Sequence, residues 1–161
     1  MARAGAVSAS RWSDELLVAM SIILILTAIA IPNLIRAKGA ANETSACATL
    51  HTIVNSANIY SQMCPAQGFP SSLTVMGTGP GDCTGANILD TTLGVASPVK
   101  SGYKFIYAAG NVVNLVTYGW TTTADPVSSG LSGQRHFFVD QSGVIRANAT
   151  AAATVVDPAI Q

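Results

Sequence analysis

Charged residues are scarce in this chain, and they leave no net charge. The 161 residues include 8 Lys and Arg against 8 Asp and Glu, and only 10% of the side chains are charged. Aromatic residues are also scarce, at 6%. Proteins that bind nucleic acids present basic surfaces to phosphates and aromatic rings on which bases stack. The composition therefore argues against nucleic-acid binding as the main task of this chain.

Motifs for nucleotide binding, catalysis or metal ligation are lacking as well. The glycine-rich run 77–81 is not followed by the Gly-Lys-Ser/Thr of a phosphate-binding loop. Three loop aspartates do not have the spacing of an EF-hand. They are Asp82, Asp90 and Asp125. His136 and Asp140 would share one face of a strand, as in a weak hydrolase or metal pair, but alternation in exposed hairpins produces such pairs routinely. We expect no enzyme activity, no cofactor and no metal.

The hydrophobic residues are concentrated in one segment, Leu16 to Ile35. These twenty residues contain no charge. As a helix they would span roughly 30 Å, the hydrocarbon thickness of a bilayer. A cleavable secretory signal has a shorter apolar core that ends at small residues, whereas Arg36 and Lys38 follow this run directly. We therefore expect a membrane-spanning helix over 16–35; a plain signal anchor is the alternative.

Two acids, Asp14 and Glu15, precede the apolar run, where a carboxylate is costly unless it is paired. A local explanation places both in a first helical turn, with Arg11 as the i,i+4 partner of Glu15. The second interpretation is that Glu15 neutralises a cation on another copy of the chain inside a bundle of apolar helices. In that case Glu15 would set the axial register between subunits.

Specific motifs begin and end the apolar run. They are Glu15-Leu16-Leu17-Val18 and Ala28-Ile29-Ala30-Ile31-Pro32-Asn33-Leu34-Ile35-Arg36-Ala37. With the β-branched and alanine-rich core between them, they resemble the amino-terminal segment of type IV pilins and of the related pseudopilins of type II secretion. The later stretches 102–105 and 135–147 are also similar to pilin-like proteins, with less specific motifs. The resemblance implies a subunit whose apolar helix first lies in a membrane and then polymerises.

The resemblance also implies a leader over residues 1–10, which prepilin peptidase would remove between Ser10 and Arg11. The spacing from Glu15 and the spacing from Pro32 give the same position. The family pattern has Gly before the cut and usually Phe after it, whereas this chain has Ser10 and Arg11. The freed α-amine of Arg11 would pair with Glu15 of a neighbouring subunit; in an uncleaved chain the Arg11 guanidinium could partly replace it.

We expect one long helix over residues 11–62. Its second half carries an apolar stripe at helical spacing, which indicates packing against a partner. The residues of this stripe are Cys47, Leu50, Val54 and Ala57. In the apolar half, Pro32 removes a backbone donor and crowds the carbonyl of Ala28. Pro32 is either a tolerated proline of a membrane helix or, as the resemblance implies, a point at which helical order is lost on assembly.

Residues 63–161 are expected to form a globular head that begins with a loop over 63–101, where Gly, Pro, Ser and Thr are frequent. Three cysteines leave one without a partner. The separation of seventeen positions between Cys47 and Cys64 corresponds to roughly 25 Å along a helix, too far for a disulfide. Cys64–Cys83 is the best candidate, and Cys47–Cys83 is the alternative.

The remainder of the head is predicted to be a β-sheet over 102–150. Aromatic and β-branched residues indicate strands over 103–108 and 112–120, joined by a turn at 109–111. A second hairpin is expected over 134–148. About four antiparallel strands, covered by the apolar stripe of the helix, predict an α+β fold.

Together the residues and the resemblance predict a structural subunit of a type IV pilus-like helical homopolymer, with Glu15 setting the register. The precursor would lie in the inner membrane, and the filament on the cell surface. By resemblance, the partners would be prepilin peptidase, an assembly ATPase and a platform protein. The alternatives are a pseudopilin of a type II secretion system in the periplasm, a single-pass anchored binding module, and a hydrolase that uses His136.

Overall fold

The computed structural model describes residues 7–160, and the side chains of residues 14–160. Its first element is a single helix, α1, over Val7–Met63. This helix was expected over 11–62, and it begins earlier because no Pro or Gly lies between Val7 and Arg11. It passes through Pro32 without ending.

The chain divides into two compact units, and the boundary falls inside α1. The first unit extends to Ala37 and the second begins at Lys38. The second unit, here called the head, therefore contains the second half of α1 together with all the described β-structure.

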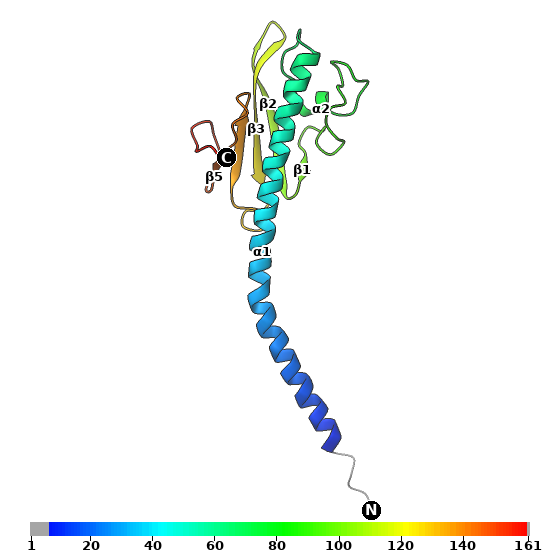
Figure 1. Cartoon of the computed structure of the whole chain (residues 1–161), viewed down its shortest axis with the longest axis vertical. Helices are drawn as coiled ribbons and strands as arrows, with labels where there is room; N and C mark the ends of the chain where they lie inside the picture. Colours follow the sequence, from blue (N-terminus) through cyan, green and yellow to red (C-terminus); the bar gives the residue numbers. More distant parts are fainter. Residues whose placement is uncertain (1–6, 161) are drawn as a thin grey trace, which may run out of the picture. The chain divides into compact units, whose positions relative to one another are not determined.

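An antiparallel sheet of five strands forms one layer of the head, in the order β1-β2-β3-β4-β5 (Figure 1). The strands are β1 (Val99–Lys100), β2 (Tyr103–Val113), β3 (Val116–Pro126), β4 (His136–Asp140) and β5 (Arg146–Asn148). The predicted α+β fold is confirmed, and the expected four strands gain a short edge strand, β1. The expected hairpin over 134–148 is the β4–β5 hairpin.

The turn of the β2–β3 hairpin lies further along the chain than the sequence indicated. The expected turn at 109–111 is wrong, because Gly110 continues the strand and pairs with Gly119. The strands are joined instead by Asn114 and Leu115, with φ values of 50° and 69°. Two-residue hairpin loops favour positive φ at both positions, since that geometry matches the twist of the strands.

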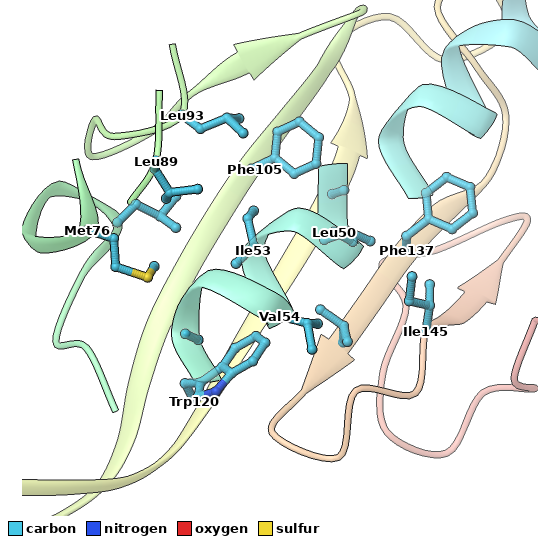
Figure 2. Packing of buried hydrophobic residues seen from close by; sticks show 14 of the residues in the cluster. Leu50, Ile53, Val54, Met76, Leu89, Leu93, Phe105, Trp120, Phe137 and Ile145 are labelled. Carbon is cyan, nitrogen blue, oxygen red and sulfur yellow. The ribbon is translucent and has the colours of Figure 1, made fainter. Parts of the chain in front are cut away.

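The core lies between the second half of α1 and one face of the sheet (Figure 2). Leu50 and Ile53 of α1 are fully buried there against side chains of β2, β3 and β4. The buried side chains of the sheet are Tyr103, Phe105, Thr117, Trp120, Thr122, Ala124, Phe137, Val139 and Ala147. The predicted stripe is confirmed: Val54 and Ala57 are buried, and Cys47 is half-buried at its edge.

The segment between α1 and β1 covers the rest of the core. It contains a short helix, α2 (Leu73–Met76), whose Leu73 and Met76 are buried. Cys64 and Cys83 form the predicted disulfide, with their Cα atoms 5.7 Å apart. Cys47 keeps a free thiol, so the alternative Cys47–Cys83 pairing is excluded.

Candidate functional site

The apolar half of α1 exposes its large side chains. Every large apolar side chain from Leu16 to Leu34 is more than half exposed. The mean hydropathy reaches 2.4 over an 18-residue window, none of which is buried. Within the described residues, α1 is the one helix that is long and apolar enough to span a membrane.

The few polar side chains in the apolar half bond to the helix backbone. Ser21 and Thr27 donate to carbonyls three residues earlier, at 2.7 and 3.0 Å. Asn33 donates through Nδ2 to a carbonyl four residues earlier, at 3.2 Å. These bonds satisfy the side-chain donors within the helix, as an apolar environment requires. The surface of this segment is therefore suited to lipid or to other apolar helices.

Glu15 lies at the start of this surface. Its side chain and that of Asp14 are exposed, and neither takes part in an ion pair among the side chains of residues 14–160. The side chains of Ser10 and Arg11 lie outside the described ones. The processing position and the pairing of Arg11 with Glu15 therefore stay predictions.

A hollow of about 360 Å³ opens at the end of the head where α1 enters it. Its lining residues are Lys38, Asn42, Ser101, Gly102, Val127, Ser128, Leu131 and Ser132. Val127 and Leu131 are 62% and 58% exposed, and Lys38 supplies a cation. We call this feature the basal hollow. Sequence reasoning missed it, because its residues come from three separate segments of the chain.

Local bonds preform the basal hollow. Asn42 of α1 donates through Nδ2 to the carbonyl of Ser132 at 2.9 Å. The backbone N–H of Ser128 donates to Oγ of Ser132 at 3.0 Å, which closes the loop on itself. Gly102 has a φ of +72°, and a Cβ there would lie 2.6 Å from Cβ of Ser132. Only glycine fits this close approach, so the floor of the hollow depends on it.

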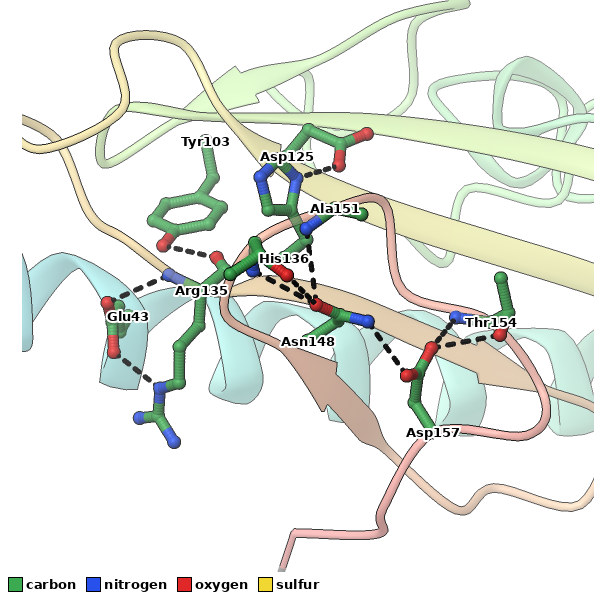
Figure 3. Close-up of polar contacts among 10 residues, drawn as sticks. Glu43, Tyr103, Asp125, Arg135, His136, Asn148, Ala151, Thr154 and Asp157 are labelled. Atoms are coloured by element: carbon green, nitrogen blue, oxygen red, sulfur yellow. Dashed lines mark hydrogen bonds and ion pairs between the residues drawn. The ribbon is translucent and has the colours of Figure 1, made fainter.

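A charged clamp holds the adjoining loop on α1 (Figure 3). Oε1 of Glu43 accepts hydrogen bonds from the backbone N–H groups of Gln134, at 2.9 Å, and Arg135, at 3.2 Å. Oε2 pairs with Nε of Arg135 at 2.7 Å. Burial would raise the pKa of the Glu43 carboxyl, but these hydrogen bonds and the Arg135 charge outweigh it and lower the pKa. The clamp joins residues more than ninety positions apart, which sequence reasoning did not connect.

The histidine singled out in the sequence pairs with a different acid. Nδ1 of His136 lies 2.6 Å from Oδ1 of Asp125 on the neighbouring strand (Figure 3). Asp140, the expected partner, instead accepts a hydrogen bond from the backbone N–H of Ser142 at 2.9 Å in the β4–β5 turn. The described residues contain no group of three or more His, Cys, Asp or Glu that could hold a metal.

A second polar cluster ties the carboxy-terminal segment to β5 (Figure 3). Asn148 donates through Nδ2 to Oδ1 of Asp157 at 2.8 Å. Oδ2 of Asp157 accepts from the backbone N–H of Thr154 at 2.6 Å. This bond is the main reason that the pKa of Asp157 is lowered. The bonding is internal, which indicates a structural role.

The β2–β3 turn carries a second exposed apolar surface, which we call the hairpin tip. Its residues are Val112, Val113, Leu115 and Tyr118, each more than half exposed. No charged residue lies between Lys104 and Asp125. That long uncharged stretch was the sequence signal for an exposed apolar surface. The surface was not predicted, because the turn was placed at 109–111 and not at Asn114 and Leu115.

Comparison of the chain with protein-family models, curated proteins and solved structures finds no match. The function is therefore argued from the geometry of the apolar half of α1 and of the head.

Proposed function

We propose that this chain is the structural subunit of a type IV pilus-like helical filament, as the resemblance around Glu15 implies. The observation that carries the proposal is the exposed apolar half of α1, joined to a head whose own apolar core is complete. Water is a poor solvent for so much contiguous apolar surface. Lipid before assembly and other copies of the helix afterwards would cover it.

Transfer from lipid to a helix bundle is not driven by hydrophobicity, because lipid tails and Leu side chains are equally apolar. The free energy would come from close packing and from Glu15. A carboxylate at the edge of a bilayer is costly without a counter-ion. In the polymer it would meet the α-amine of Arg11 on the next subunit. Each subunit would then select a neighbour displaced along the axis, and such head-to-tail contacts produce open filaments.

The proposal places the precursor in the inner membrane and the polymer on the cell surface. Prepilin peptidase would cut between Ser10 and Arg11 before assembly, and an assembly ATPase with a platform protein would drive it. Intact-mass measurement of subunits from isolated filaments tests the processing step. A chain that starts at Arg11 is expected.

Glu15→Gln tests the assembly mechanism, with Asp14→Asn as the matched control. Both changes remove one negative charge from adjacent exposed positions, and only Glu15 is assigned the pairing role. We expect sedimentable filaments from cells to fall at least tenfold for Glu15→Gln and to stay at the wild-type level for Asp14→Asn. Membrane-bound precursor should be equal in all three strains.

Equal filament yields from both variants would contradict the proposal. A single-pass anchored binding module would form no filament in any strain and would be monomeric after detergent extraction. A pseudopilin would give the same dependence on Glu15 but short polymers confined to the periplasm, which fractionation separates from surface filaments.

A further inference from the structure

The hairpin tip has two costs that no contact in the head offsets. Leu115 is 91% exposed, so its side chain gains nothing from burial. Its φ of 69° is in the left-handed region, which disfavours any side chain with a Cβ and which Gly or Asn fills in most two-residue hairpin loops. An exposed leucine under backbone strain indicates a surface that is covered in an assembly.

The head offers a complementary surface at its opposite end. The basal hollow includes Gly102, directly before β2, and the tip begins at Val112, one residue before the end of β2. The whole length of the strand therefore separates the two surfaces, about 35 Å at the rise of a β-strand. Figure 1 shows the β2–β3 turn and the start of β2 at opposite ends of the head. One chain cannot bring its own tip to its own hollow.

Charge also differs between the two ends of the head, because the acids at the basal end, Glu43 and Asp125, are already paired with Arg135 and His136. Lys38 lines the basal hollow, and Lys100 lies beside it at the start of the sheet. At the other end, Asp82 is exposed next to the Cys64–Cys83 disulfide. That end also holds the tip, because Gly68, just after the disulfide, bridges to Thr117 of β3. Heads stacked end to end would place opposite charges at the junction.

We propose that the hairpin tip of one copy docks in the basal hollow of another copy, with Leu115 between Val127 and Leu131. This inference rests on the proposed function, because polymerisation through α1 brings the heads of many copies together. The contact joins unlike surfaces of identical chains, so it is heterologous and repeats without closing. The two copies would be displaced along the axis by about one head length. The second half of α1, from Lys38 to Met63, gives roughly 38 Å for that length.

Cysteine cross-linking in the full-length chain tests the contact directly. Leu115→Cys and Leu131→Cys are combined in a Cys47→Ala background. The other two cysteines, Cys64 and Cys83, are then held in the disulfide of the head, so the introduced cysteines carry the free thiols. Cells that express this variant are oxidised mildly, and membranes and sedimented filaments are run on non-reducing gels. The double variant should give a ladder of covalent multimers, whereas either single variant should stop at dimers.

The possible outcomes test the docking of heads and the formation of filaments separately. Filaments with a ladder support the proposal. Filaments without a ladder overturn the docking of heads and leave the proposed filament function standing. A ladder in membranes without any filament supports the contact and overturns the filament. Absence of both overturns the two together.

A second set of variants measures what the contact does for assembly. Leu115→Gly removes the side chain and suits the turn, so the head should fold. The matched control is Val156→Ser, which removes an apolar side chain that is 86% exposed and belongs to neither surface. We expect Leu115→Gly to lower filament yield at least fivefold and Val156→Ser to leave it unchanged.

Leu131→Ser should lower the filament yield as much as Leu115→Gly. The double variant should have the same yield as either single variant, because both substitutions remove the same contact. Independent, multiplicative losses would overturn the assignment of Leu115 and Leu131 to a shared interface.

Discussion

The two halves of α1 are equally helical but have opposite surroundings. In the first half Leu24 is 69% exposed, and in the second half Leu50 is fully buried. The second half is amphipathic: one stripe packs on the sheet, and polar residues such as His51 and Asn55 are exposed on the other side. The first half is apolar around its whole circumference, as helices in lipid or in apolar bundles are. Among the described residues, only the second half of α1 packs against other parts of the chain.

The largest expected difference between the halves is in the stability of the head. Leu50→Ala should lower its free energy of unfolding by about 2–5 kcal/mol, because it leaves a cavity in a closed core. Leu24→Ala should change it by less than about 0.5 kcal/mol. Urea unfolding of the full chain in detergent, followed by the fluorescence of buried Trp120, measures both. Equal losses would contradict the separation of the two surfaces.

Removal of the disulfide should have the next largest effect on the free energy of unfolding of the head. Cys64→Ser with Cys83→Ser is expected to destabilise the head by about 2–4 kcal/mol, since the bond constrains the unfolded chain. The helical signal from the apolar half should be retained in detergent. Cys47→Ala, which removes only the free thiol, is the control and should cost less than about 1 kcal/mol. A loss of helix in the first half would show that the halves are not independent.

The clamp at Glu43 predicts a smaller, pH-dependent effect. Glu43→Gln should destabilise the head by about 1–2 kcal/mol at neutral pH, because it removes charge-assisted hydrogen bonds. The pKa of Glu43 is lowered in the folded state. The stabilisation is therefore complete above the unfolded pKa and is lost as the pH falls through the folded pKa.

Urea unfolding at pH 7 and at pH 3 measures this dependence. The difference between wild type and Glu43→Gln should shrink at the lower pH. Asp14→Asn, in the exposed half of the helix, should leave the stability of the head unchanged at both values. A difference that grows on acidification would contradict the direction given for Glu43.

The smallest expected effect is an increase in the stability of the head. Leu115→Gly relieves a left-handed leucine, worth about 1–2 kcal/mol, and adds flexibility to the unfolded chain that costs roughly 0.5–1 kcal/mol. The head should become more stable by about 0.5 kcal/mol, as urea unfolding would show. A clear loss of stability would mean that Leu115 has contacts within the head, and its role in docking would then be unnecessary.

Local patterns in the sequence predicted much of this architecture. Hydropathy located the apolar helix, helical spacing located the stripe that includes Leu50, and the distance along a helix excluded a Cys47–Cys64 bond, while the structure decided between the two remaining pairings. The turn at 109–111 was wrong because Gly110 was taken as a turn residue, although glycine also occurs where strands pair closely. The clamp between Glu43 and Arg135 was missed because no local pattern links residues so far apart.

Residue order alone was enough to establish the long helix, its change from uniformly apolar to amphipathic, and the α+β class. Each of these follows from side chains within a few turns or one hairpin of each other. The folded arrangement decided the rest: which acid His136 meets, how Glu43 holds its loop, and the placing of Leu115 and the basal hollow at opposite ends of β2. These features join segments that are distant along the chain, and their proximity is set by the packing of the helix on the sheet.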